Sequence, residues 1–242
     1  MRVSRLFLPI SLQPGELLSL DNDSAHYLRS VLRLKKGDAL TVFDGQGCEF
    51  PSTLTEMHRE FVHIQLGAAH ELDLESPLKT HLGLGVSRSE RMDFAIQKAV
   101  ELGVTEITPL FTERSVVQLD DSRQKQRVRH WQKIVQSACE QCGRNRLPLV
   151  HPPLKLATWI ESSEGLRLVL HPHGGKCLHE LERPNHLVTL LSGPEGGFSE
   201  SERGWALRKG FIPLRLGPRI LRSETAALAA LSSIQTLWGD LG

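Results

Sequence analysis

The sequence of 242 residues has little of what marks several specialised classes of protein. It contains only four cysteines. So few thiols exclude a disulfide-rich secreted scaffold and fit a reducing compartment. No apolar run is long enough to span a bilayer, and residues 1–16 lack the uncharged core of a secretory signal. We therefore expect a cytoplasmic protein with no membrane partner.

A metal site is not indicated either. Cys139 and Cys142 form a lone C-x-x-C, and structural zinc would need a second ligand pair that the sequence lacks. Two thiols one helical turn apart are the favoured interpretation, and metal or redox use is the alternative. His171 and His173 lie at an expected strand end, where nothing completes a ligand set. We expect no metal.

The charge of the chain is nearly balanced, with a formal net charge of +1, so net charge alone does not indicate nucleic acid. Between Asp121 and Arg146, however, seven basic residues accompany two acidic ones. Such a stretch is suited to phosphates, but a solvated helix face is an equal alternative on charge alone. The basic residues that could contact nucleic-acid phosphates, here and in the N-terminal part, are Arg5, Arg29, Arg33, Arg123, Arg127, Arg144 and Arg146, and a partner subunit's pocket is the alternative for Arg144 and Arg146.

The order of patterns predicts two domains, at residues 1–72 and 73–242. In the first, Ala39–Gly47 is a strand closed by an Asp-Gly turn and Phe61–Gly67 is a second strand. Asp23 is a plausible N-cap of one short helix between them and the N-terminus. Several short strands with one helix indicate a small barrel.

The second domain follows a polar linker at residues 68–77. Strands and helices then alternate, which indicates a parallel α/β sheet. Ser87 and Glu90 have the spacing of a capping box for the first of these helices, which Gly103 should end. The expected strands cover 81–87, 107–111, 166–172, 186–193 and 211–217, and the expected helices include one through 128–138 and one over 224–238.

Two glycine-containing bends follow strands near the C-terminus, in SGPEGGFSESE and LGPRILRSETAAL. The glycines of the first bend should allow positive φ and close approach to a ligand. Ser199 with Glu202, and Ser223 alone, are expected to cap the helices that follow. Because ligands bind at the carboxyl ends of parallel strands, the bends should form one pocket. No phosphate-binding motif is present and Glu195 would repel phosphate, so a heterocycle without phosphates is expected.

These segments, with RMDFAIQKAVELGVTEITPLF and WQKIVQSACEQCGRNRLP, resemble the SPOUT-class methyltransferases. The match is to the bacterial family that methylates N3 of a uridine in 16S ribosomal RNA, and it covers the whole chain. The resemblance implies a PUA-like RNA-binding β-barrel followed by a SPOUT α/β domain with a C-terminal trefoil knot. It also implies S-adenosylmethionine (SAM) as cofactor, a homodimer with active sites at the subunit interface, and 16S rRNA in the assembled small ribosomal subunit as substrate.

The chemistry of N3 methylation, which the resemblance implies, suggests roles for residues of the second bend and for Glu195 of the first. Arg222 is expected to stabilise the uridine anion, and Glu224 and Glu195 are candidate bases. Glu224 is equally suited to the positive end of a helix dipole, and Glu195 to bonds with loop amides. The residues that match the family's cofactor loops are Leu170, His171, Leu191, Ser192, Gly193, Pro194, Glu195, Gly196, Gly197, Leu216, Gly217, Pro218, Ile220, Leu221 and Thr225.

Two other functions are compatible with these residues. One is a non-catalytic RNA-binding module, whose C-terminal domain would only dimerise and would not bind the cofactor. The other is an enzyme of the same class that methylates ribose or another base.

Overall fold

The structure is a computed structural model that describes residues 3–58, 61–115, 121–172 and 174–242. It divides into two compact units, Met1–Glu75 with Cys139–Leu147, and Ser76–Ala138 with Pro148–Gly242. The expected boundary after residue 72 lies near the end of the first of these ranges. Residues 139–147 were expected in the second domain, but their contacts place them in the first unit.

The first unit is built on a six-stranded sheet. Burial alternates along its strands, as in the sequence Val62, Ile64 and Leu66, so one face of the sheet carries the core. The strand order along the sheet is β1 (Ser4–Phe7), β3 (Ala39–Phe43), β4 (Cys48–Met57), β5 (Val62–Leu66) and β2 (Leu17–Leu20), with β6 (His70–Glu71) paired to β4.

One short helix accompanies this sheet, and its start differs from the expectation. The helix α1 (Asn22–His26) continues into a π-helical turn, η1 (Tyr27–Val31). Its N-cap is Asp21 and not Asp23, because the extended backbone at Asp21 brings its carboxylate to Ser24 N at 2.8 Å.

Residues 139–147 belong to the first unit because their polar side chains find partners there. The Glu140 carboxylate accepts hydrogen bonds from Phe7 N (3.0 Å) and from the Tyr27 hydroxyl (3.3 Å). The Asn145 amide donates to Leu72 O at 2.9 Å. A buried carboxylate and a buried amide require such partners, so these bonds fix the segment in place.

The second unit contains a seven-stranded sheet in which every pair of strands is parallel, as expected. Its order is β10 (Leu154–Lys155), β8 (Glu106–Phe111), β7 (Lys79–Gly85), β12 (Leu187–Ser192), β11 (Leu166–Leu170) and β13 (Ile212–Leu214), with β9 (Leu149–Val150) paired to β8.

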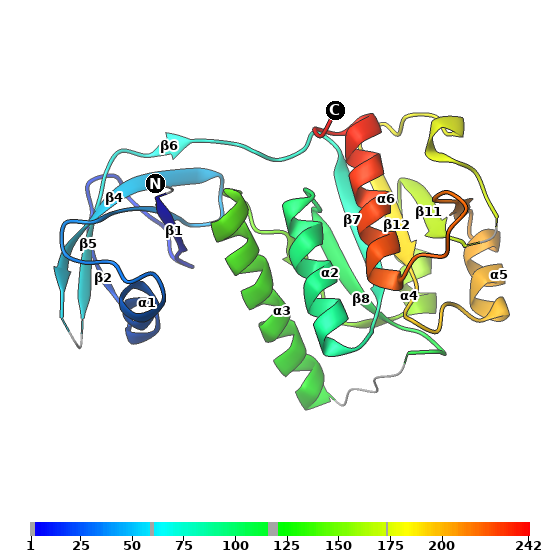
Figure 1. The fold of residues 1–242 in the computed structure, drawn as a ribbon, viewed down its shortest axis with the longest axis horizontal. Helices are drawn as coiled ribbons and strands as arrows, with labels where there is room; N and C mark the ends of the chain where they lie inside the picture. The colour runs from blue at the N-terminus through cyan, green and yellow to red at the C-terminus, as the bar shows by residue number, and fades with distance from the viewer. Residues whose placement is uncertain (1–2, 59–60, 116–120, 173) are drawn as a thin grey trace. The chain divides into compact units, whose positions relative to one another are not determined.

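Helices cover this sheet. The helices α2 (Ser89–Glu101) and α6 (Ser223–Trp238) pack side by side, and α3 (Asp121–Cys142) lies next to α2 (Figure 1). Residues of α4 (Leu156–Ser162) and α5 (Glu200–Arg208) share a core with the strand residues Leu110, Val169 and Leu191. A 3₁₀ turn, η2 (Leu178–Glu180), precedes β12. In the described part of the chain, no helix combines the length and apolarity needed to cross a membrane.

Of the three predicted caps in this unit, one is confirmed and two are wrong. Ser199 Oγ accepts from Glu202 N (3.1 Å), and Glu202 Oε2 accepts from Ser199 N (2.9 Å), which completes the capping box of α5. Ser87 does not cap α2, which begins after Arg88. Ser223 does not cap α6 because it is already the first helical residue, with its hydroxyl bonded to Glu224.

Candidate functional site

Three loops leave neighbouring strands at one edge of the second unit's sheet. They follow β11, β12 and β13, which lie side by side in parallel register. Because the carboxyl ends of parallel strands meet at the same edge, the three loops converge. They surround a cavity of about 570 Å³, which is within the usual range for small-molecule sites.

Most of the residues expected to hold a cofactor line this cavity. Leu191 does not, because it is fully buried in the core beneath the cavity, and Pro218 and Thr225 also lie outside the lining. Arg222 lines the cavity, whereas Glu224 does not. The expected residues found in the lining are Leu170, His171, Ser192, Gly193, Pro194, Glu195, Gly196, Gly197, Leu216, Gly217, Ile220 and Leu221.

The glycines of these loops serve two purposes. Gly197 (φ 64°) and Gly217 (φ 71°) adopt the left-handed conformation that favours glycine. Gly193 and Gly196 were expected to have positive φ as well, and this is wrong. They are instead crowded, since a Cβ at Gly193 would lie 3.2 Å from the Phe198 ring and one at Gly196 would lie 3.1 Å from Arg114 Cβ.

Glu195 is held by residues at the start of α2. Its Oε1 accepts from Arg88 N at 3.2 Å and lies 3.3 Å from Arg91 Nη1. Its Oε2 is buried and has no hydrogen-bond partner among the described residues. A buried carboxylate oxygen without a donor is unfavourable, so a ligand that supplies a donor or a positive charge would be stabilised beside it.

The loop that follows β8 holds the same region from another side. Arg114 Nη1 donates to Gly196 O at 3.2 Å, and Glu113 N donates to Glu202 Oε1 at 2.8 Å. Sequence reasoning missed Arg91 and Arg114, although the rule of strand ends applies to β7 and β8 too. It also missed cavity residues that have no local motif: Pro172, Phe198, Arg203, Leu214, Ser223 and Ala226.

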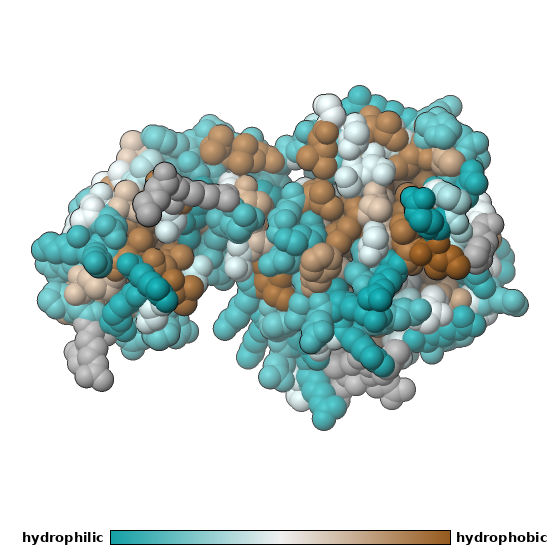
Figure 2. Space-filling view, in the orientation of Figure 1, coloured by the Kyte–Doolittle hydropathy of each residue, from teal (hydrophilic) through white to brown (hydrophobic). Residues whose placement is uncertain are grey.

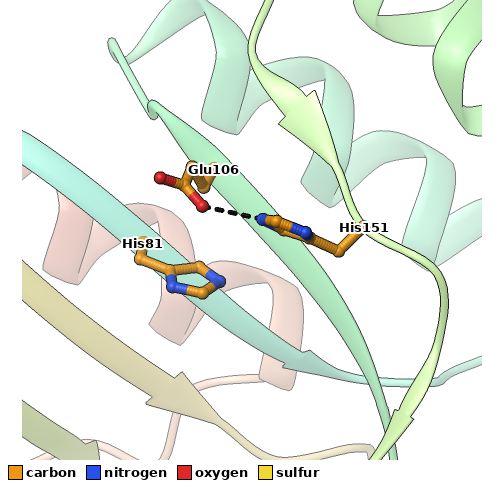
Figure 3. A group of neighbouring side chains, drawn as sticks. All are labelled: His81, Glu106 and His151. Atoms are coloured by element: carbon orange, nitrogen blue, oxygen red, sulfur yellow. Dashed lines mark hydrogen bonds and ion pairs between the residues drawn. The ribbon is translucent and has the colours of Figure 1, made fainter. Parts of the chain in front are cut away.

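A second cluster of titratable side chains lies on the face of the sheet that α4 covers (Figure 3). The donor atoms of His81, Glu106 and His151 lie within 4.8 Å of one another, and His151 Nε2 is 2.7 Å from Glu106 Oε2. His81 Nε2 accepts from Trp159 Nε1 at 3.3 Å. Burial is the main cause that lowers the pKa of His81 to about 4, so its ring is neutral at pH 7.

The geometry of this cluster does not favour a metal. His81 Nε2 already has two contacts, Thr108 Oγ1 at 2.8 Å and the indole N–H of Trp159, which can only donate, so this nitrogen has no lone pair left for a metal. Trp159 has no room to move, because it is 2% exposed and packs against Gly83, where an added Cβ would lie 2.4 Å from the ring. We assign this partly buried cluster a structural role.

The cysteine pair is not arranged for redox chemistry. Cys139 and Cys142 are free thiols, and burial raises the pKa of Cys139 to about 12. A thiol with so high a pKa is a poor nucleophile and a poor metal ligand. His171 lines the cavity, and His173 lies outside the described residues.

Two of the expected RNA-binding residues are internal to the first unit. Arg5 bonds Glu49 and Asn145, and Arg144, which is 5% exposed, pairs with Glu75, with Arg144 Nε 2.9 Å from Glu75 Oε1. Both guanidinium groups therefore lie inside the first unit.

The other candidates are more accessible. Arg29 donates to a backbone carbonyl, Arg33 adopts a positive φ of 55° on the surface, and Arg146 is half exposed beside Asp73. In the second unit, Arg123 is exposed on α3, and Arg127 donates to Ser89 Oγ at 2.6 Å.

A parallel sheet with a glycine-rich cavity at its carboxyl edge is arranged to bind a small molecule, and comparison with protein families gives the class of the protein. Residues 74–235 match the model of an RNA methyltransferase domain, and residues 20–67 match that of an RNA methyltransferase PUA domain. The chain therefore belongs to the RNA methyltransferase family.

More particularly, it is similar to proteins named ribosomal RNA small subunit methyltransferase E, which confirms the resemblance seen in the sequence. The Buchnera aphidicola (Schizaphis graminum) relative is 39% identical over 99% of this chain and 98% of its own length. The Bacillus subtilis relative is 28% identical over 96% of each chain.

Solved structures of similar proteins support the same family assignment. A Legionella pneumophila protein in complex with the bound cofactor SAM has a TM-score of 0.96 and 40% identity, covering 100% of both chains. A Neisseria gonorrhoeae ribosomal RNA small subunit methyltransferase E bound to S-adenosyl methionine has a TM-score of 0.93 and 37% identity, also over 100% of both chains.

Proposed function

We propose that this protein uses SAM to methylate N3 of a specific uridine in 16S rRNA, within the assembled small ribosomal subunit. Full-length similarity to ribosomal RNA small subunit methyltransferases supports the reaction class. The observation that carries the proposal is the cavity at the carboxyl edge of β11, β12 and β13. The cytoplasm is the compartment in which this substrate is found.

The residues of the cavity fit SAM. Its walls are rich in loop backbone, which suits a heterocycle bound by main-chain hydrogen bonds, and its size is that of a small-molecule site. The unpartnered Oε2 of Glu195 suits a ligand with a positive charge. When bound, SAM supplies an electrophilic methyl group on a positively charged sulfur.

Transfer to N3 requires that N3 lose its proton. We assign Arg222, which lines the cavity and is exposed, to the uracil carbonyl oxygens, where its guanidinium stabilises the anion. Glu195 is the proposed proton acceptor, because it is the one carboxylate side chain in the described cavity lining. Glu224 acts instead at the N-terminus of α6, where its negative charge interacts favourably with the helix dipole.

We further propose a homodimer, a SPOUT-type trefoil knot in the C-terminal part, and RNA binding by the PUA-like unit, as the family resemblance implies.

Mass spectrometry of 16S rRNA nucleosides from cells with and without the gene tests the proposal. We expect 3-methyluridine to be lost in the deletion strain and restored by the wild-type gene. Retention of 3-methyluridine without the gene would refute the substrate assignment. Absence of SAM binding to the purified protein, measured by calorimetry, would favour the non-catalytic RNA-binding module instead.

A further inference from the structure

The cavity carries much more positive charge than its cofactor can use. Five arginines line it, and Glu195 is the one carboxylate in the described lining. That carboxylate is already paired with Arg91. SAM itself has one carboxylate against a sulfonium and an ammonium group, so it enters with net positive charge. Like charges at short range oppose binding, so the arginines serve a different, anionic group.

Two of the five are free to bind that group. Arg114 is bonded to Gly196 O, and Arg222 is assigned to the uracil edge. For Arg203, in the second turn of α5, and Arg219, in the exposed loop before α6, no carboxylate partner exists among the described residues. We call Arg203 and Arg219 the rim pair.

Basic side chains also lie on α3, which contacts the start of α2. Figure 2 shows a hydrophilic surface over the amino-terminal half of α3, where Arg123, Lys125 and Arg129 are exposed. Arg127 of α3 bonds Ser89 at the start of α2, and the preceding residue, Arg88, donates its amide to Glu195 in the cavity wall. These bonds place the basic helix beside the cavity, so one polyanionic strand has a route to both.

We infer that the rim pair forms a phosphodiester subsite for the substrate RNA strand, and that RNA and SAM therefore bind cooperatively. The inference rests on the proposed function, since it assigns the strand that presents the uridine. A phosphodiester beside the rim pair neutralises charge that opposes the cofactor. Coupling is reciprocal, so each ligand raises the affinity of the other by the same factor.

Calorimetry of SAM binding to the full-length protein, with and without saturating octauridylate at fixed ionic strength, tests the inference. We expect octauridylate to tighten SAM binding about tenfold, a typical coupling. The double variant Arg203→Gln, Arg219→Gln should lose this coupling, while its SAM affinity without RNA does not fall. The slope of log affinity for octauridylate against log salt should fall by about 0.7 for each phosphate that the variant no longer neutralises. Arg208→Gln, also on α5 but outside the cavity lining, is the matched control and should behave as wild type.

Several outcomes overturn the inference. They are equal SAM affinity with and without octauridylate in the wild type, unchanged coupling in the double variant, and weaker SAM binding in the double variant without RNA. Inorganic phosphate at the same concentration should have a smaller effect, and an equal effect would assign the subsite to free phosphate. If the wild type binds SAM but octauridylate does not change its affinity, the phosphodiester subsite is refuted and the proposed function stands. If 3-methyluridine is present in 16S rRNA without the gene, the proposed function is refuted.

Discussion

Gly85 is a residue outside the cavity lining whose substitution should disable the cavity. A Cβ at Gly85, the last residue of β7, would lie 2.5 Å from both N and Cδ of Pro194 and 2.9 Å from Gly193 C. Ordinary Cβ contacts begin near 3.4 Å, so the loop after β12 would have to retreat by about 0.9 Å. The obstacle is backbone and a proline ring, which a rotamer change does not relieve.

Two magnitudes follow for Gly85→Ala. Overpacking of this kind costs about 1–3 kcal/mol of folding free energy. A displacement near 1 Å in a positioning loop lowers productive binding or catalysis on the order of 100-fold. We therefore expect a folded protein whose SAM affinity is reduced about 10- to 100-fold, measured by calorimetry alongside urea unfolding.

Gly165→Ala provides the control. Gly165 precedes β11, at the opposite strand end from the cavity, and has φ 71° with Leu187 O 2.5 Å from an added Cβ. It should be destabilised comparably, yet bind SAM as wild type does. If Gly85→Ala is folded and binds SAM normally, or if both variants lose affinity equally, the steric reasoning is refuted.

Three further predictions follow. Because folding lowers the pKa of His81 from 6.5 to about 4, the unfolded state binds a proton more readily, and the free energy of unfolding declines from its full value above pH 6.5 toward pH 4. Urea unfolding should show a loss of about 2 kcal/mol by pH 5, and His81→Gln should abolish this loss. An equal decline in the variant would contradict the assignment to His81. Arg144→Ala leaves the Glu75 carboxylate unpaired and should destabilise the first unit by about 3 kcal/mol without changing the salt dependence of RNA binding. A smaller slope of log RNA affinity against log salt in this variant would show that Arg144 contacts RNA. Arg222→Lys should retain SAM affinity but reduce methyl transfer at least tenfold, because an ammonium lacks the planar fork; an unchanged single-turnover rate would remove Arg222 from the reaction.

The parallel α/β architecture of the second unit was predictable because its strands and helices have strong local signals. The capping box of Ser199 and Glu202 is such a signal, and it is confirmed. Helix starts without side-chain caps were not predictable, since Arg88 and Arg222 precede α2 and α6 without any capping bond. A nearby serine in each case suggested a cap that the backbone does not use.

Contacts between distant segments account for the rest. Glu140 and Arg144 have the composition of a surface helix end, and only their partners Tyr27 and Glu75, more than sixty residues away, make them internal. The glycine-containing loops of the cavity were recognisable in the sequence, whereas a lone arginine such as Arg203 has no local sequence motif. Its place in the lining depends on how three loops converge.

Transfer of a labelled methyl group tests the central claim most directly. Purified protein would be incubated with small ribosomal subunits from a strain lacking the gene and with SAM that carries a trideuterated methyl group. Mass spectrometry of the 16S rRNA nucleosides should then reveal the label in 3-methyluridine and in no other nucleoside. Label in a ribose, in another base, or in no nucleoside at all would contradict the account.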